Sequence, residues 1–170
     1  MHTYTADIRW TCDNISDFTS KRYSRAHTWG FDGGVSVPAS SSPNSVRVPY
    51  SNPANVDPEE AFVAALSSCH MLTFLFLASV DGYAVAAYTD AASGIMEKIA
   101  NGKEAVTQVT LRPQIVFSGD KVPTDAVLDD LHHRAHEDCY LANSVKTVIA
   151  VQGQWQHRFS AVSAHEKPAT

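Results

Sequence analysis

Cysteine is scarce in this sequence. Only three of the 170 residues are cysteine. That number is too small, and odd, for the disulfide framework that holds small secreted domains together. It fits a reducing compartment, where disulfides are transient and belong to a catalytic cycle. We therefore expect a cytoplasmic protein in which any cysteine pair serves a reaction.

The sequence also lacks a basic stripe and a secretory signal. The net charge is −5, and the lysines and arginines are scattered. This distribution argues against nucleic acid as a partner. The first ten residues, MHTYTADIRW, contain no basic segment followed by an apolar run. We therefore expect neither a cleaved leader nor nucleic-acid binding.

One long stretch has no charged residue at all, from Ala61 to Val80. Its length is close to what a bilayer span requires. Acidic residues flank it, and no lysine or arginine lies close by to set a topology. The stretch also contains six polar or weakly polar residues: Ser67, Ser68, Cys69, His70, Thr73 and Ser79. We interpret it as a core helix buried on every side, not as a membrane segment.

Local signals fix both ends of this helix. Asp57 suits the N-cap, Pro58 suits the first helical position, and Glu60 completes a pattern typical of a capping box. Gly82 suits the position just after the helix, where a left-handed backbone is common. We therefore predict a helix from Pro58 to about Asp81.

The remaining pattern predicts one domain, 1–170, of the α+β class, because strands and helices are segregated. A second helix begins at Pro123-Thr124, with Thr124 as N-cap, and ends near Cys139 with a short helical continuation through Asn143. We expect a polar loop from Cys12 to Ala26 between the first two strands. The expected strands are 3–11, a hairpin over 27–40 with its turn at 32–34, 83–95 with its turn, 105–111, 114–117, and a closing pair within KTVIAVQGQWQHRF.

Cys69 and Cys139 indicate redox chemistry only when they are considered as a pair. A lone helical cysteine is usually a small buried hydrophobe, and we interpret Cys12 as structural. A thiol peroxidase needs a cysteine thiolate that is stabilised by a cation or by hydrogen-bond donors. It also needs a second cysteine that condenses with the sulfenic acid formed on the first.

Three motifs resemble the OsmC/Ohr family, the osmotically inducible and organic hydroperoxide resistance proteins. DPEEAFVAALSSCHM resembles the central-helix signature, in which Pro58 and Glu59 precede Cys69 at the family's spacing. AHEDCYLANSV resembles the second-cysteine motif and contains Cys139. YSRAHTWGFDGG resembles the N-terminal segment of an OsmC-like branch and contains Arg25.

The resemblance implies an OsmC-like fold, with antiparallel β-sheets around two central helices in an intertwined homodimer. It also implies a peroxidase that reduces organic hydroperoxides without a bound cofactor or metal, using a dihydrolipoamide-like dithiol as reductant. Cys69 would be the nucleophile and Cys139 the resolving thiol. Arg25 would stabilise the thiolate, and Glu59 would hold Arg25; Arg22 is the alternative arginine.

Helix geometry adds one expectation about Glu59. Ten residues separate it from Cys69, which is about 15 Å along a straight helix and roughly 80° away from the same face. The two side chains cannot meet within one helix. If Glu59 serves the Cys69 site, it comes most simply from a second subunit.

Other functions fit parts of the sequence. His132 and His136 lie four residues apart and Cys139 follows, so that with Cys69 and His70 they offer the ligand types of a zinc site. A Cys-His hydrolase would use Cys69 as nucleophile and would not need Cys139. An OsmC-like fold could also bind a ligand or a metal without peroxidase activity.

Overall fold

A computed structural model describes residues 1–158 of the chain. Contacts divide the chain into two compact units, Met1–Phe62 and Val63–Thr170. The long helix α2, Pro58–Val80, contributes its first turn to the first unit and the remainder to the second. We describe each unit separately, and the expectation of a single domain stays a prediction.

The first unit contains a small antiparallel sheet of order β1-β2-β3. Its strands are β1 (Asp7–Arg9), β2 (His27–Gly30) and β3 (Ser36–Ala39). The predicted hairpin is confirmed, and Pro38 lies on an edge strand, where a missing N–H is tolerated. The predicted loop after β1 contains a short helix instead, α1 (Ile15–Thr19). Asn14 caps it by accepting hydrogen bonds from the backbone N–H groups of Ser16 and Asp17.

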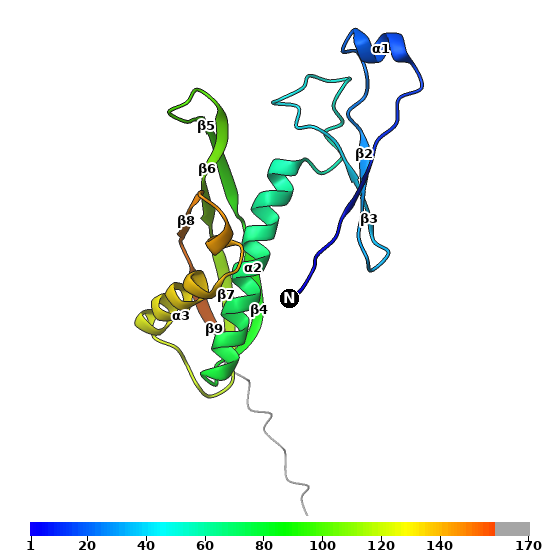
Figure 1. Ribbon diagram of the computed structural model, residues 1–170. Coiled ribbons are helices and arrows are strands. Elements are labelled where there is room, and N and C mark those ends of the chain that lie inside the picture. Colours follow the sequence, from blue (N-terminus) through cyan, green and yellow to red (C-terminus); the bar gives the residue numbers. More distant parts are fainter. Residues whose placement is uncertain (159–170) are drawn as a thin grey trace, which may run out of the picture. The chain divides into compact units, whose positions relative to one another are not determined.

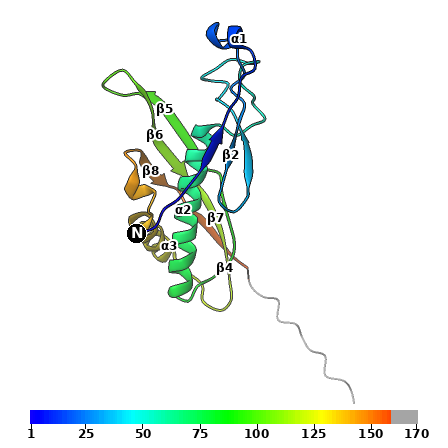
Figure 2. The same cartoon turned by 45° about the vertical axis from the view of Figure 1, so that its right-hand side comes forward.

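The second unit contains two three-stranded sheets, of order β4-β7-β9 and β5-β6-β8. Figures 1 and 2 both show β5 and β6 as a long hairpin. The strand pairs β4 and β5, β6 and β7, and β8 and β9 each contribute one strand to each sheet. The chain therefore passes from one sheet to the other at Ala91-Ala92, at Arg112 and at Gln152-Gly153. The strands are β4 (Ala84–Asp90), β5 (Ser93–Lys98), β6 (Glu104–Leu111), β7 (Pro113–Ser118), β8 (Val148–Val151) and β9 (Gln154–Arg158).

Parallel pairing in this unit departs from the expected antiparallel arrangement. The β4–β7 and β5–β6 pairs are antiparallel, but β8 pairs in parallel with β6, and β9 with β7. The closing strands therefore form as predicted, but they pair with earlier strands and not with each other. The crossover through helix α3 (Asp125–Asp138) explains this, because parallel neighbours need a long connection.

The predicted ends of α2 are confirmed. The Glu60 N–H donates to Asp57 Oδ1 at 2.8 Å, and the Asp57 N–H donates to Glu60 Oε2 at 3.2 Å, which completes a capping box. At the other end, Gly82 has φ +76°, and the Tyr83 N–H donates to the Ala78 carbonyl at 2.9 Å. This is the bonding of a Schellman motif, which favours glycine.

Burial on every side of α2 was expected, and this expectation was wrong for the single chain. Leu66, His70, Phe74 and Ala78 form one buried stripe at four-residue spacing. The opposite side leaves Leu72, Phe76 and Val80 61–65% exposed. A helix that is apolar all round needs covering surfaces on more than one side, and residues 1–158 cover only one of them.

By length and composition α2 could cross a membrane, and within residues 1–158 no other helix passes that test. Core helices of soluble proteins pass it too. The buried stripe of α2 packs into the apolar core of the second unit, as a core helix does. That core consists of Phe74, Ala78, Ile115, Phe117, Leu128, Leu131 and Ala135.

Candidate functional site

The structure brings the two predicted redox cysteines together. Cys69 lies in the middle of α2 and is half-buried, whereas Cys139 directly follows α3 and is 1% exposed. Their thiols interact, since Cys69 raises the pKa of the Cys139 thiol. The more accessible sulfur is therefore on the helix that carries the nucleophile motif.

Local structure controls the chemistry of Cys139. Burial raises the pKa of its thiol, and the hydrogen bond with Cys69 raises it further. Backbone N–H groups of Ala142 and Leu141 oppose this rise by stabilising the thiolate. The net direction is upward, so Cys139 keeps its proton at neutral pH.

The turn after α3 places those amides beside the Cys139 sulfur. Thr124 caps the start of α3 by accepting a hydrogen bond from the Val127 N–H, as predicted. At the far end, Asn143 Nδ2 donates to the carbonyls of Glu137 (2.7 Å) and Cys139 (3.2 Å). A short 3₁₀ helix, η1 (Ala142–Ser144), follows, as the predicted helical continuation. The sequence motif indicated Cys139 but gave no sign of the role of Asn143.

A buried histidine pair next to the cysteines was not predicted. His70 Nε2 lies 3.0 Å from His132 Nδ1, and the two ring planes are nearly parallel, with centroids 5.3 Å apart and an interplanar angle of 16°. His132 also lies 4.6 Å, centroid to centroid, from the Phe74 ring. His70 is 1% and His132 7% exposed. The pair joins α2 to α3 through a polar contact inside the core.

Two features border this histidine pair. A Cβ atom placed on Gly153 would collide with the His132 ring, so the turn between β8 and β9 approaches that ring closely. Asp90 lies on the His70 side, where its charge opposes the lowering of the pKa of His70. The Asp90 carboxylate accepts hydrogen bonds from Ser67 Oγ at 2.5 Å and from the Arg112 N–H at 2.6 Å.

The zinc set considered as an alternative does not form in the described residues. No group of three or more His, Cys, Asp or Glu side chains in residues 1–158 is arranged to hold a metal ion. His132 turns its Nδ1 toward His70, and the Cys139 thiol interacts with Cys69. The i, i+4 histidines of α3 therefore do not act as a joint ligand set.

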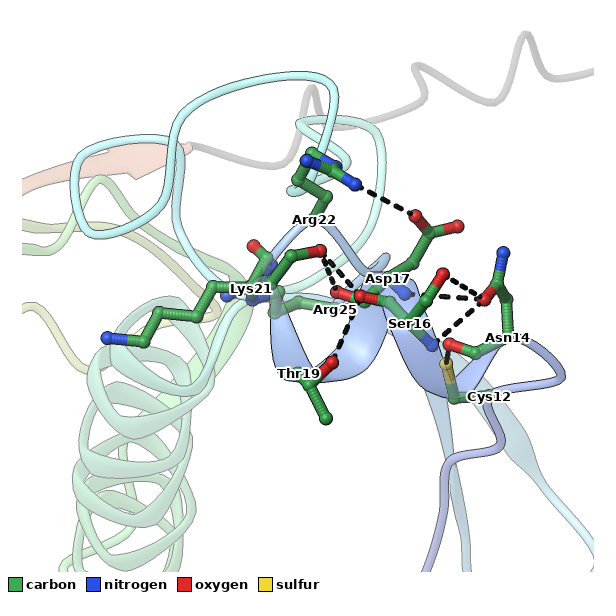
Figure 3. A network of polar contacts seen from close by, with 9 residues as sticks. Cys12, Asn14, Ser16, Asp17, Thr19, Lys21, Arg22 and Arg25 are labelled. Atoms are coloured by element: carbon green, nitrogen blue, oxygen red, sulfur yellow. Dashed lines mark hydrogen bonds and ion pairs between the residues drawn. The ribbon is translucent and has the colours of Figure 1, made fainter.

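The two candidate arginines differ in their surroundings (Figure 3). Arg25 is half-buried, and its guanidinium donates to the Tyr23 carbonyl at 2.5 Å and to the Lys21 carbonyl at 3.2 Å. It also lies 3.8 Å above the centre of the Tyr23 ring. Arg22 is exposed and forms an ion pair with Asp17 at 3.8 Å. Arg25 is thus the more tightly held of the two.

Glu59 lies in the first turn of α2 and is half-buried. Within residues 1–158 it forms no hydrogen bond or ion pair. Glu59 and Arg25 belong to the unit Met1–Phe62, whereas both cysteines belong to the other unit.

Comparison with known proteins agrees with the resemblance. The model of the OsmC-like protein family matches residues 51–152. An OsmC-like protein of unknown function from Vibrio cholerae is 53% identical, with a TM-score of 0.87; the match covers 91% of this chain and 100% of that one. No curated protein matches.

More distant structures share the fold. An organic hydroperoxide resistance protein from Elizabethkingia anophelis is 17% identical with a TM-score of 0.64, covering 93% of this chain and 98% of that one. The organic hydroperoxide resistance protein OhrB of Bacillus subtilis is 15% identical with a TM-score of 0.58, covering 91% and 98%. At these identities the likeness concerns the fold.

Proposed function

Since this chain belongs to the OsmC-like protein family, we propose that it is a thiol-dependent peroxidase that reduces organic hydroperoxides. The observation that carries the proposal is the interaction between the Cys69 and Cys139 thiols, through which Cys69 raises the pKa of the Cys139 thiol. These two thiols are 70 positions apart in the sequence, so their interaction comes from the fold and not from local sequence. Structural relatives named for organic hydroperoxide resistance add support.

In the first step the Cys69 thiolate attacks one oxygen of the hydroperoxide. The O–O bond breaks, the alkoxide leaves and takes up a proton to become an alcohol, and Cys69 becomes a sulfenic acid. The Cys69 sulfur is oxidised by two electrons and the peroxide is reduced by two. Half-exposure of Cys69 suits this role, because the attacking sulfur must meet its substrate.

In the second step the Cys139 sulfur attacks the sulfenic sulfur of Cys69. The S–O bond breaks, and the hydroxide leaves as water with the Cys139 proton, forming the Cys69–Cys139 disulfide. The raised pKa of Cys139 keeps that thiol protonated in the reduced protein, which leaves the first attack on the peroxide to Cys69. A dithiol then reduces the disulfide through two exchange reactions; dihydrolipoamide is a reductant of this class.

The proposal gives Arg25 and Glu59 supporting roles. Arg25 would stabilise the Cys69 thiolate, and Glu59 would hold that arginine by a bidentate carboxylate–guanidinium pair. Along the unbroken helix α2, Glu59 and Cys69 are about 15 Å apart. We therefore propose a homodimer in which the Glu59 of each site comes from the other subunit.

The exposed stripe of α2 supports a homodimer. Leu72, Phe76 and Val80 follow one another at four-residue spacing and expose 61–65% of their surface. Sedimentation should show a dimer for the parent protein and a monomer for the Leu72→Asp/Phe76→Asp variant. The control is Val148→Asp, at an equally exposed apolar residue of β8. A parent protein that sediments as a monomer would contradict the proposed dimer.

Turnover with cumene hydroperoxide and dihydrolipoamide tests the proposed activity. The parent should consume peroxide continuously, Cys69→Ser should be inactive, and Cys139→Ser should stop after about one turnover for lack of a resolving thiol. Cys12→Ser is the matched control and should keep parental activity. An inactive parent would refute the proposal. A Cys139→Ser protein that keeps turning over would show that the dithiol reduces the Cys69 sulfenic acid directly, and it would refute the resolving role of Cys139.

A further inference from the structure

The buried contact between His70 and His132 has no role in the chemistry proposed above. Each histidine of the pair lies on the same helix as one of the two cysteines, or just before it. His70 follows Cys69 directly on α2, and Cys139 follows His132 by seven residues on α3. Seven residues make nearly two helical turns, so His132 and the start of the Cys139 turn lie on one side of α3. The same two elements thus meet at a histidine contact and at a cysteine contact.

We propose that His70 and His132 are positioning residues that set the approach of Cys139 to Cys69. The inference rests on the proposed function for its biological meaning, but not for its geometry. A hydrogen bond of 3.0 Å between two ring nitrogens fixes both the distance and the rotation of the rings. Apolar packing alone, as in the core around Phe74 and Leu131, restricts sliding of α3 along α2 less, because apolar contacts are not directional.

The residues around the histidine pair leave space that fits these two rings. The His132 ring occupies the space beside Gly153, and a side chain at position 153 would collide with it. The second nitrogen of each ring, Nδ1 of His70 and Nε2 of His132, is buried without a hydrogen-bond partner in the described structure. Buried unpaired nitrogens cost stability, so an apolar pair would be the simpler way to fill this space. A requirement for alignment of α2 with α3 accounts for keeping the histidines.

The redox equilibrium of the cysteine pair measures the alignment directly. A thiol that is held against its partner forms a disulfide with a higher effective concentration, and misalignment lowers that value. Equilibration with reduced and oxidised dithiothreitol gives the equilibrium constant for the Cys69–Cys139 disulfide. This measurement needs no peroxide, so it stays informative even if the parent proves to have no peroxidase activity.

Two substitutions of His132 separate position from packing. His132→Asn keeps a polar atom close to the place of Nδ1, whereas His132→Phe keeps an aromatic ring without a nitrogen. We expect His132→Phe to lower the equilibrium constant about tenfold, and His132→Asn to stay much closer to the parent value. The control is His133→Phe, at a neighbouring residue whose side chain is 71% exposed, which should change nothing.

Two further variants distinguish a loss of alignment from a loss of folding. Gly153→Ala pushes on the His132 ring without altering either histidine and should also lower the equilibrium constant. His70→Leu/His132→Leu removes both polar partners at once, so it should fold with little loss of thermal stability and still lower the constant about tenfold. Stability and alignment are thereby read separately. An unchanged constant in the folded double-leucine protein would overturn the proposal, as would equal losses in His132→Asn and His132→Phe.

Discussion

Acid should destabilise this protein through its two buried imidazoles. Burial lowers the pKa of His70 to about 4; His132 and His136 add to the effect, and Asp90 opposes it. Burial also lowers the pKa of His132 to about 4. In the unfolded chain both side chains return to an ordinary pKa of about 6.5. Unfolding at mildly acidic pH therefore takes up protons.

The difference between the folded and unfolded pKa values sets the sign and the size of the change in the free energy of unfolding with pH. Between pH 6.5 and 4 the unfolded chain binds protons that the folded protein does not, so the free energy of unfolding falls as pH falls. The contribution is complete above about pH 6.5 and lost near pH 4. For each histidine it amounts to roughly 3 kcal/mol, at about 1.4 kcal/mol per pKa unit. Near pH 5 both histidines together give a slope of about 2.7 kcal/mol per pH unit.

Urea unfolding followed by tryptophan fluorescence measures this slope. The parent and the His70→Leu/His132→Leu variant are compared at about pH 5, 6 and 7.5. All samples are held at one protein concentration, because association would add its own contribution. The parent should lose about 2 kcal/mol more than the variant between pH 6 and 5. His133→Gln should follow the parent. Equal slopes in parent and double variant would refute the buried, neutral state of the pair.

Three further predictions concern single sites. Cys139→Ser should become overoxidised at Cys69 under excess peroxide, gaining about 32 Da by mass spectrometry as the sulfinic acid, and an unmodified Cys69 would argue against a resolving role. Arg25→Gln should lower kcat/KM on the order of 10²-fold while Arg22→Gln leaves it unchanged, and the reverse result would exchange their roles. Asp57→Ala should lower the free energy of unfolding by ~1 kcal/mol through loss of the capping box, and no change would contradict that contact.

Features that depend on neighbouring residues could be predicted from the sequence. Asp57, Glu60 and Gly82 define the ends of α2 because caps involve residues within one turn. Thr124 does the same for α3. The cysteine motifs also indicated which two thiols meet. Asn14, which caps α1, is a local signal of the same kind, but a loop was predicted there and the helix was missed.

Features that depend on distant partners could not be predicted. β8 and β9 read correctly as strands, but nothing within them specifies parallel pairing with β6 and β7. β5 has no buried residue and so no alternating pattern to indicate a strand. The contact between His70 and His132 joins residues 62 positions apart. Helix periodicity showed that α2 is apolar all round, but not which side its own chain covers.

Disulfide mapping after a single oxidation tests the central claim most directly. Reduced protein would receive one equivalent of cumene hydroperoxide, free thiols would be blocked, and unreduced peptides would be identified by mass spectrometry. The account predicts a crosslink between Cys69 and Cys139 in most molecules, with Cys12 blocked as a free thiol and one alcohol formed per disulfide. Peroxide that is consumed while Cys69 and Cys139 both remain free, or a crosslink that involves Cys12, would contradict it.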